Sequence, residues 1–302
     1  MENSCAGFTQ PAVFVIIPVY NAERTLERCL DSLVNQSYPN WIACLADDCS
    51  SDASGAIARL YMERDRRFLY LPAKRNGGPS VARNRAMAAA QGKYVAFLDS
   101  DDWWAETFLE EMVAAVEQNG ADFVQCGWTL EWPGGASLPE ENIYPTQRVF
   151  SRAEFSEPLK RMLGGISMNH VARKLVRREL LEGLRFSTEL KTAEDLLMCF
   201  QLLMRAQRVV FLPRPLYHYF RQGTGLTGGG LPFREKWKAN RSVARMMRRF
   251  VRGTEFDTPR YRLLIWLRPY RLLISKAVRV LQDSRMLGAR GERKTDNKDN
   301  NT

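Results

Sequence analysis

Hydrophobic and polar positions alternate between two patterns along the first hundred residues. Residues 13–17 form an uninterrupted apolar run that ends at Pro18, which is typical of a strand buried on both faces. The apolar residues that follow recur at helical spacing and predict an amphipathic helix, with Asn21 as its N-cap. Its apolar positions are Leu26, Leu30, Leu33 and Val34.

This pair of elements repeats along the chain. We predict further strands at 41–46, 68–71 and 94–98, and helices at 56–61 and 79–90. Pro79 suits the first turn of the last helix, and Gly92 suits the position just after its end. This alternation predicts a mostly parallel sheet whose ligands bind beyond the carboxyl ends of its strands. Three polar clusters follow predicted strands directly and would share one crevice, at 18–21, 47–50 and 99–102.

The rest of the chain has a mixed pattern. We expect helices at 108–116, 153–163 and 196–205, strands at 121–128 and 209–212, and a loop at 133–139. Residues 228–232 are rich in Gly and Pro and are expected to break the chain. Basic helical stretches interrupted by Pro259 and Pro269 follow, and the polar residues 287–302 are predicted to be disordered.

The composition is that of a soluble globular protein. Of the 302 residues, 45% are hydrophobic and 26% charged, which excludes a collagenous or wholly disordered protein. No apolar window reaches the ~18 residues that a membrane span needs, and the N-terminus lacks the layout of a secretory signal, so we expect a cytoplasmic protein. Six cysteines without C-x-x-C spacing are interpreted as reduced packing residues, and two histidines exclude most zinc chemistry.

Positive charge is concentrated near the C-terminus. The formal net charge is +10, but residues 233–281 contain fourteen Lys and Arg against three Asp and Glu and so carry +11, which leaves −1 for the rest. Three interpretations of this segment compete: a surface that lies on an anionic membrane, a nucleic-acid-binding surface, and a solvated helical flank with its apolar side against the body of the protein.

An acidic turn follows the predicted strand at 94–98. It contains Asp99, Asp101 and Asp102, and three neighbouring carboxylates repel one another unless a cation lies among them. Hard oxygen ligands suit Mg²⁺ or Mn²⁺. The alternative is that these acids merely cap a helix beginning near Ala105, and spacing alone does not separate the two interpretations.

Four segments in register together carry a family resemblance. They read VIIPVYN at 15–21, LADDCSSD at 45–52, NGGPSVARN at 76–84 and FLDSDD at 97–102. Together they resemble the family 2 glycosyltransferases over about residues 12–227. The resemblance implies the A-type glycosyltransferase (GT-A) fold, an α/β architecture with a Rossmann-like, mostly parallel sheet, and nucleotide-diphosphate sugar donors.

The resemblance, the charge distribution and the composition together predict a division of the chain. Residues 1–11 would be a tail, and residues 12–230 the glycosyltransferase domain, with a nucleotide-sugar half at 12–128 and an acceptor half at 129–230. A basic helical extension at 231–286 and a disordered tail at 287–302 would follow.

The same resemblance implies a donor site. Its nucleotide-binding residues would be Pro18, Tyr20, Asn21, Asp48, Asn76, Arg83, Asp99 and Arg221. Pro18, Tyr20 and Asp48 would surround the base, and Arg83 would lie near the base or the diphosphate. Asp99 and Asp101 become a D-x-D pair, in which Asp99 would hydrogen-bond the ribose or a metal-bound water and Asp101 would contact the Mn²⁺ or Mg²⁺ that bridges the two phosphates. A cation there offsets the growing charge of the leaving group. Cys49 stands where the family usually has glycine.

Residues 192–197 resemble the family's Glu–Asp motif. In that motif the aspartate is the usual base, so Asp195 is the candidate that takes the proton from the acceptor hydroxyl, and Glu194 would position it or the acceptor. Burial or a neighbouring carboxylate would raise the pKa of Asp195 toward a useful value. The alternative is a helix N-terminus enriched in acids. One base opposite the departing phosphate predicts inversion of the anomeric configuration.

Other candidates have structural alternatives. His218 is a candidate third metal ligand, although a histidine between aromatic residues is more often packed and hydrogen-bonded, as we also expect of His170. Arg221 is a candidate partner of the diphosphate, with surface packing as the alternative. Residues 223–228 spell G-x-G-x-x-G without the context of a dinucleotide site, and we interpret them as a mobile loop that closes over the donor.

These features together predict a metal-dependent, inverting glycosyltransferase with a UDP-sugar donor. The acceptor would be a saccharide or a lipid-linked molecule in the synthesis of surface polysaccharide, lipopolysaccharide or glycolipid. Because such acceptors are often lipid-linked, we favour membrane binding for residues 233–281, with the protein peripheral on the inner face, and disfavour nucleic acid. The alternative is a catalytically silent module that binds nucleotide or sugar on the same fold.

Overall fold

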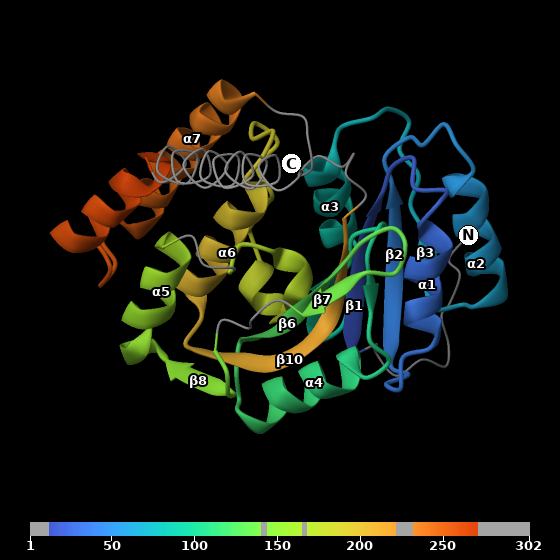
Figure 1. The fold of residues 1–302 in the computed structure, drawn as a ribbon, viewed down its shortest axis with the longest axis horizontal. Coiled ribbons are helices and arrows are strands. Elements are labelled where there is room, and N and C mark those ends of the chain that lie inside the picture. Colours follow the sequence, from blue (N-terminus) through green and yellow to red (C-terminus); the bar gives the residue numbers. More distant parts are fainter. Residues whose placement is uncertain (1–11, 140–143, 165–167, 222–231, 271–302) are drawn as a thin grey trace, which may run out of the picture. The chain divides into compact units, whose positions relative to one another are not determined.

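The protein is represented by a computed structural model that describes residues 12–139, 144–164, 168–221 and 232–270. Contacts divide the chain into two compact units, Met1–Pro232 and Phe233–Thr302. Figure 1 shows the elements of both units in chain order. The predictions for residues 1–11, 223–228 and 287–302 fall outside the described residues.

The first unit is built on a sheet of ten strands. Their order is β3-β2-β1-β4-β9-β6-β10-β5, with β7 paired to β6 and β8 paired to β10. The bounds are β1 Val13–Val19, β2 Trp41–Asp47, β3 Phe68–Tyr70, β4 Tyr94–Phe97, β5 Trp103–Trp104, β6 Phe123–Glu131, β7 Ser137–Pro139, β8 Arg148–Ser151, β9 Lys174–Arg177 and β10 Arg208–Phe220. β1 to β4 are parallel, β9 runs antiparallel between β4 and β6, and β10 is parallel to β6. The prediction of a mostly parallel α/β sheet is confirmed.

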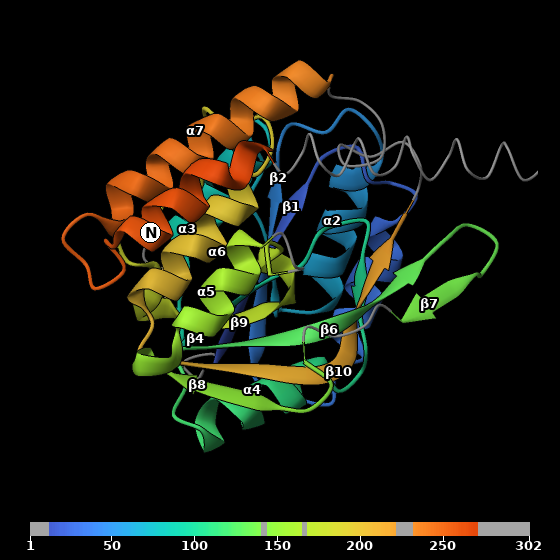
Figure 2. The ribbon, with the colours of Figure 1, turned by 60° about the vertical axis from the view of Figure 1, so that its left-hand side comes forward.

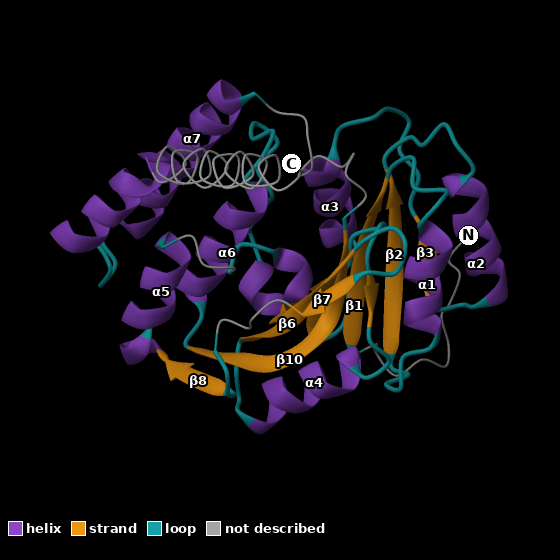
Figure 3. Ribbon diagram, in the orientation of Figure 1, coloured by secondary structure: helices purple, strands orange, loops and turns teal. Residues whose placement is uncertain are grey.

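Helices cover both faces of this sheet (Figures 2 and 3). α1 (Leu26–Val34), α2 (Ser54–Arg64) and α4 (Phe108–Gln118) pack on one face, in a single apolar core with alternate residues of β1. α3 (Pro79–Ala88) and α6 (Glu194–Arg205) lie on the other face. β1 is apolar at successive positions because both of its faces are covered.

The remaining helices of the first unit are short. They are α5 (Ser156–Leu163) and 3-10 turns at Arg152–Glu154, Val171–Arg173 and Arg178–Leu181. The helix predicted at 153–163 is therefore a 3-10 turn followed by α5.

Two predictions about turns are wrong. Asn21 does not cap α1, which begins at Leu26 after Thr25. Instead Asn21 has a left-handed backbone, with φ of 48°, and its Oδ1 accepts a hydrogen bond from the Ser51 N–H at 2.9 Å. The loop predicted at 133–139 contains β7, because Gly134 and Gly135 take positive φ values that close a hairpin onto β6.

The strand predicted at 209–212 continues to Phe220. Prolines at 213 and 215 conceal it in the sequence, since proline cannot donate to a strand ladder, and the pairing with β6 shifts register on both sides of Pro215. β5, β8 and β9 have two to four residues each and were not predicted. Segments this short carry too few positions for an alternating pattern to show.

The cysteines described by the structure are all unpaired. Cys29, Cys44, Cys126 and Cys199 are buried, which agrees with reduced packing residues. Cys49 is exposed, so the packing interpretation is wrong for that residue.

The second unit contains two described helices, α7 (Phe233–Val251) and a helix over residues 259–270. Pro259 does not interrupt a helix but starts one, because its fixed φ suits the first turn. The helical stretches therefore do break before Pro259, over residues 252–258, whereas Pro269 lies inside the second helix and the interruption predicted there is wrong. In the part of the chain that the structure describes, no helix is long and apolar enough to cross a membrane.

Candidate functional site

The carboxyl ends of β1, β2 and β4 bring the three polar clusters to one edge of the sheet. β1 lies between the other two strands, so the turns that follow them adjoin. The Asp48 N–H donates to the Val19 carbonyl at 2.8 Å, and the Asn21 N–H donates to Ser50 Oγ at 3.1 Å. The predicted meeting of these clusters is confirmed.

The first cluster, at 18–21, contains a solvent-exposed aromatic side chain. Tyr20 is 52% exposed and lies two positions after Pro18, which is half-buried. An exposed ring of this kind is a surface on which a nucleotide base can stack. Cys49 keeps φ at 67°, the left-handed conformation in which the family's glycine is unstrained. The turn is therefore retained, at a strain of about 1–3 kcal/mol.

Asp48 holds the loop that leads into α3. Its carboxylate is 2% exposed and accepts hydrogen bonds from the N–H groups of Gly77 and Gly78. A Cβ at Gly77 would come within 2.9 Å of Val81, and Gly78 has φ of 85°, so both positions need glycine. Asn76, which precedes them, is exposed. Asp48 thus fixes the loop that carries Asn76, and its role at a base stays a prediction.

Arg83 joins two segments that the sequence analysis treated separately. It is 5% exposed, and its Nη2 lies 2.7 Å from Asp99 Oδ1. Its Nη1 lies 3.5 Å from Glu194 Oε1 and 3.4 Å from Asp195 Oδ1. Burial lowers the pKa of Arg83, but the surrounding carboxylates raise it by more, so the guanidinium stays charged. The acidic turn and the Glu–Asp motif therefore share one buried cation.

Asp195 lies in the first turn of α6 with a strongly perturbed acidity. Burial raises its pKa to about 7, although the Arg83 charge and the Val171 backbone N–H act in the opposite direction, and Glu194 adds to the rise. The preceding residue, Ala193, has φ of 65°, which turns the chain into the helix. A carboxyl group with a pKa near 7 can accept a proton at neutral pH.

The three acids of the turn have different partners. Asp102 is 1% exposed and accepts hydrogen bonds from the Tyr217 hydroxyl and, at 2.8 Å, from the Phe220 N–H. Asp99 is paired with Arg83, as described above. Burial and the Asp99 charge raise the pKa of Asp101 to about 6. Protein groups thus pair with Asp99 and Asp102, but burial and the charges of Asp101 and Asp99 still raise the pKa of Asp102.

The helix-capping interpretation of this turn is wrong. α4 begins at Phe108, and the residue before it is Thr107. Within the described ranges, no group of three or more His, Cys, Asp and Glu is arranged to hold a metal ion. Asp99 and Asp101 supply two carboxylates, and one or two carboxylates completed by substrate phosphates are how proteins commonly bind Mg²⁺.

His218 belongs to an aromatic cluster beside the acidic turn. Its ring stacks on Trp103 at 5.1 Å, and its Nδ1 lies 2.8 Å from Glu131 Oε1. The Arg28 guanidinium lies 3.9 Å from the centroid of a Trp103 ring and 4.2 Å from that of Phe220. Arg28 also donates to the Asp101 carbonyl at 3.0 Å. These contacts agree with a packed, hydrogen-bonded histidine, and a ligand role for His218 stays a prediction.

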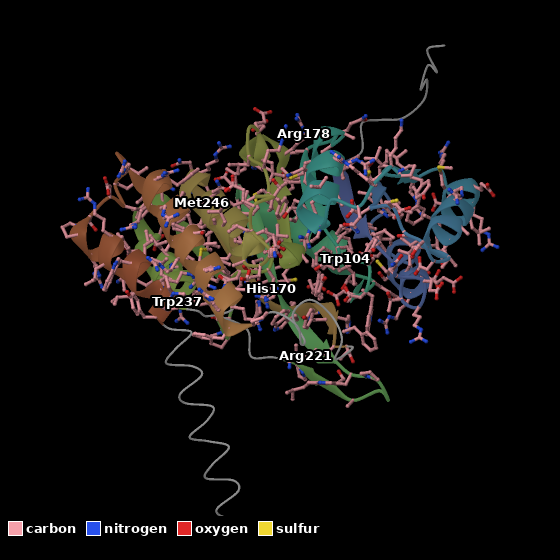
Figure 4. All side chains as sticks on the ribbon, turned by 90° about the horizontal axis from the view of Figure 1, so that it is seen from above. Trp104, His170, Arg178, Arg221, Trp237 and Met246 are labelled. Atoms are coloured by element: carbon pink, nitrogen blue, oxygen red, sulfur yellow. The ribbon has the colours of Figure 1, made fainter. Side chains whose placement is uncertain are left out.

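The two remaining candidates, Arg221 and His170, lie near the carboxyl end of β10. Arg221 is exposed, and its N–H donates to the Glu131 carbonyl at 2.8 Å (Figure 4). His170 lies between Trp128 and Tyr219, with ring centroids 4.6 and 6.2 Å away. Burial lowers the pKa of His170 to about 3, helped by nearby positive charges, so this ring is neutral at pH 7.

Sequence reasoning missed three side chains around the site. Tyr217 and Arg28 hold the acidic turn, and Lys174 is fully buried, with its Nζ donating to the carbonyls of Met168 and His170. Nothing in the sequence marks Arg28 or Lys174, since a lone basic residue within a helix or strand usually faces solvent. Tyr217 gives the only signal, as one of several aromatic residues in the run at 216–220.

The fold and the arrangement of the acidic clusters define a GT-A type nucleotide-sugar fold. Its sheet superposes on the crystal structure of S. aureus TarS in complex with UDP-GlcNAc with a TM-score of 0.68, at 24% identity, covering 82% of this chain and 68% of that one. The Pyrobaculum calidifontis mannosyltransferase PcManGT, in complex with GDP-Man and Mn²⁺, gives a TM-score of 0.60 at 19% identity, covering 93% and 81%.

Sequence comparison identifies the family. The model of glycosyl transferase family 2 matches residues 14–185, and the chain belongs to this family. The uncharacterized glycosyltransferase EpsJ of Bacillus subtilis (strain 168) is 34% identical over 223 residues, which cover 72% of this chain. The chain spans 63% of the length of EpsJ.

Proposed function

We propose that the protein transfers a sugar from a nucleotide-diphosphate donor, a UDP-sugar, to a hydroxyl group of a saccharide or lipid-linked acceptor. The product would belong to a surface polysaccharide, lipopolysaccharide or glycolipid, made at the cytoplasmic face of a membrane. The observation that carries this proposal is the pairing of Arg83 with both Asp99 and Asp195, since it joins the donor side to the candidate base. Membership of the family supports the reaction, and the UDP-GlcNAc complex of TarS supports the donor class.

The donor would occupy the edge formed by the three strand ends. The exposed ring of Tyr20 and the adjoining Pro18 offer a surface for the base, and the loop held by Asp48 carries Asn76 and leads to Arg83. Arg221 lies in the open at the end of β10, where a flexible guanidinium could bind a phosphate in bidentate fashion. This arrangement supports the eight donor residues named from the resemblance.

A divalent cation fits the acidic turn. Asp99 and Asp101 are two hard oxygen donors, and they lie near enough that the Asp99 charge helps to raise the pKa of Asp101. Asp102 is occupied by Tyr217 and Phe220 and would not take part. When bound, Mn²⁺ or Mg²⁺ would neutralise the negative charge that develops on the departing nucleoside diphosphate.

Asp195 would act as the general base. In its ionised form it accepts the proton of the acceptor hydroxyl as the oxygen forms a bond to the anomeric carbon and the bond to the phosphate oxygen breaks. Arg83 keeps part of the Asp195 population ionised and holds the carboxylate in place, while Glu194 completes the ion pairing. Attack opposite the leaving diphosphate inverts the anomeric configuration.

Substitution of the base tests this proposal. Asp195→Asn keeps the size of the side chain but cannot accept a proton, so we expect donor hydrolysis and transfer to fall by about 10²–10⁴-fold. UDP-sugar binding should persist, which a thermal-shift assay with and without Mn²⁺ measures, because a ligand at ~100 times its Kd adds ~2.7 kcal/mol of stability.

Asp65→Asn is the matched control. Asp65 also pairs with an arginine, Arg67. It lies at the end of α2, away from the carboxyl ends of the strands, so its loss should leave turnover unchanged. Turnover by Asp195→Asn at the wild-type rate would contradict the assignment. Donor binding by the wild-type protein with no turnover on any acceptor would instead favour a catalytically silent binding module.

A further inference from the structure

The second helix of the C-terminal unit has two apolar faces. Tyr261 and Ile265 are buried, and the ring of Tyr261 packs against Phe256 of the same unit at 5.7 Å. On the opposite side four large apolar residues recur at i, i+3, i+4 and i+7, the spacing of a single helical face. This apolar stripe consists of Leu263, Trp266, Leu267 and Tyr270, which are 53%, 48%, 38% and 40% exposed. A solvated flank needs no such face.

α7 carries a continuous basic face. Seven exposed Arg and Lys recur on one side of α7 and its following residue, opposite the buried positions Val243 and Met247. This basic face consists of Arg234, Lys238, Arg241, Arg245, Arg248, Arg249 and Arg252. Glu235 is the single acidic residue of α7. Residues 233–270 contain eleven basic and three acidic residues, which gives +8.

Aromatic contacts bring the apolar stripe next to α7. The ring of Tyr270 packs edge-on against Trp237 of α7 at 5.2 Å and against Trp266 at 5.0 Å. On a helical wheel of α7, Trp237 falls between the buried side and the basic face. The stripe and the basic face therefore adjoin, with Trp and Tyr side chains at the boundary. Arg260 and Arg262 flank the stripe on its own helix.

We propose that the apolar stripe and the basic face together bind the surface of an anionic phospholipid bilayer. The stripe would enter the boundary between headgroups and acyl chains, and the basic face would pair with lipid phosphates. Trp and Tyr are the side chains favoured at that boundary. That this membrane carries a lipid-linked acceptor rests on the proposed function, whereas the binding of the stripe and the basic face to a bilayer does not.

The chemistry favours a bilayer over the other occupants. Nucleic acid would use the basic face and could stack bases on Trp266 and Tyr270, but it gains nothing from the exposed Leu263 and Leu267 beside them. A second copy of the unit would bring a second charge of the same sign against the basic face, which opposes association. Only an anionic, partly apolar partner satisfies both parts of the surface.

Vesicle flotation of the full chain tests the proposal. We expect the wild-type protein to float with equimolar phosphatidylglycerol–phosphatidylcholine vesicles and not with pure phosphatidylcholine vesicles. The double variant Leu263→Ser/Trp266→Ser should weaken binding to the anionic vesicles at least tenfold and abolish the blue shift of tryptophan emission. Both residues are exposed, so far-UV circular dichroism should be unchanged.

A charge-reversal variant tests the basic face. Arg245→Glu/Arg248→Glu should lower vesicle affinity by more than about twentyfold, since each basic residue near an anionic surface contributes about fivefold. Its control, Arg24→Glu/Arg64→Glu, makes the same change in net charge at exposed positions of the first unit. Leu60→Ser/Leu138→Ser is the corresponding control for the apolar stripe.

Three results would overturn the proposal. They are failure of the wild-type protein to float with anionic vesicles, an equal loss of binding in the control variants, and dissociation of a dimer by the stripe variant with no change in flotation. Tighter binding of a DNA or RNA oligonucleotide than of vesicles at the same salt concentration would assign the surface to nucleic acid instead. Donor hydrolysis measured without vesicles is a separate result and tests the proposed function alone.

Discussion

Arginine occupies two contrasting environments in this chain. In the first unit, Arg83 is buried and its guanidinium contacts Asp99, Glu194 and Asp195 at 2.7–3.5 Å. In the second unit, the arginines of the basic face are exposed along α7, which has a single acidic residue. The same side chain therefore works as a fixed structural cation in one unit and as a dispersed surface charge in the other.

The difference shows what burial does to a charge. In the interior, desolvation of a charge is costly, and removal of one charged residue leaves its partners buried without a counter-charge. One buried residue therefore determines the charge state of several others. On the surface, water and salt screen each arginine, so a single residue contributes little and only the sum over many matters. A site for chemistry is expected in the first environment, and a site for electrostatic association in the second.

Removal of Arg83 should give the largest change in stability. Arg83→Met keeps much of the apolar stem but leaves Asp99, Glu194 and Asp195 without their cation, so we expect the free energy of unfolding to fall by about 3–5 kcal/mol at pH 8. Urea unfolding measures it. The loss should be smaller at pH 5.5, because the freed carboxyl groups can take up protons.

Arg248→Met is the control for this measurement. Arg248 is exposed on α7, and surface substitutions of this kind change stability by less than about 0.5 kcal/mol. Equal losses in the two variants would remove the distinction between the two environments.

The donor side of the site could be predicted from the sequence because its signals are local. A buried strand, a polar turn and a helix follow one another within about twenty residues, and β1, β2 and β4 place the turns after Val19, Asp47 and Phe97 side by side. Three of the four motif segments run from these strands into the turns, and the fourth, at 76–84, leads into α3. Short-range patterns therefore predicted the fold, and the motif segments supplied the candidate donor residues, whose roles stay predictions.

The contacts that join this edge of the sheet to α6 and β10 could not be predicted to the same extent, because they are distant in the sequence. Arg83 meets Asp195 across more than a hundred residues, and Asp102 meets Tyr217 across 115. β9 enters the sheet between β4 and β6 although it has only four residues. Neither spacing nor periodicity carries information on such pairs, so only the three-dimensional arrangement shows which carboxylate is paired with which donor.

Loss of the Tyr217 hydroxyl should have an intermediate effect. Tyr217→Phe leaves the buried Asp102 carboxylate with the Phe220 N–H but without its phenolic donor, so stability should fall by about 1–3 kcal/mol. Tyr61→Phe removes a phenol–carboxylate hydrogen bond to Asp31 on the surface and should cost much less. Chemical denaturation of both variants gives the comparison, and equal values would show that burial of Asp102 does not matter.

A change of one pH unit should have the smallest effect on the free energy of unfolding. The sign of this effect should differ between interior and surface acids. Burial raises the pKa of Asp195 to about 7 from a model-peptide value of 3.8, so the folded state holds more protons than the unfolded state between these two values. The free energy of unfolding should therefore fall as the pH rises from about 4 to 7, by at most ~1.4 kcal/mol per pH unit for this group. Asp195→Asn should make that slope shallower, and the remaining part belongs to Asp101 and Asp102, whose pKa values are also raised by burial. Glu117 behaves oppositely, because the hydrogen bond from Lys93 lowers its pKa, so its contribution is present at neutral pH and lost on acidification. Glu117→Gln should leave the slope above pH 5 unchanged, and identical slopes in the wild-type protein and Asp195→Asn between pH 6 and 7 would mean that Asp195 is ionised throughout this range.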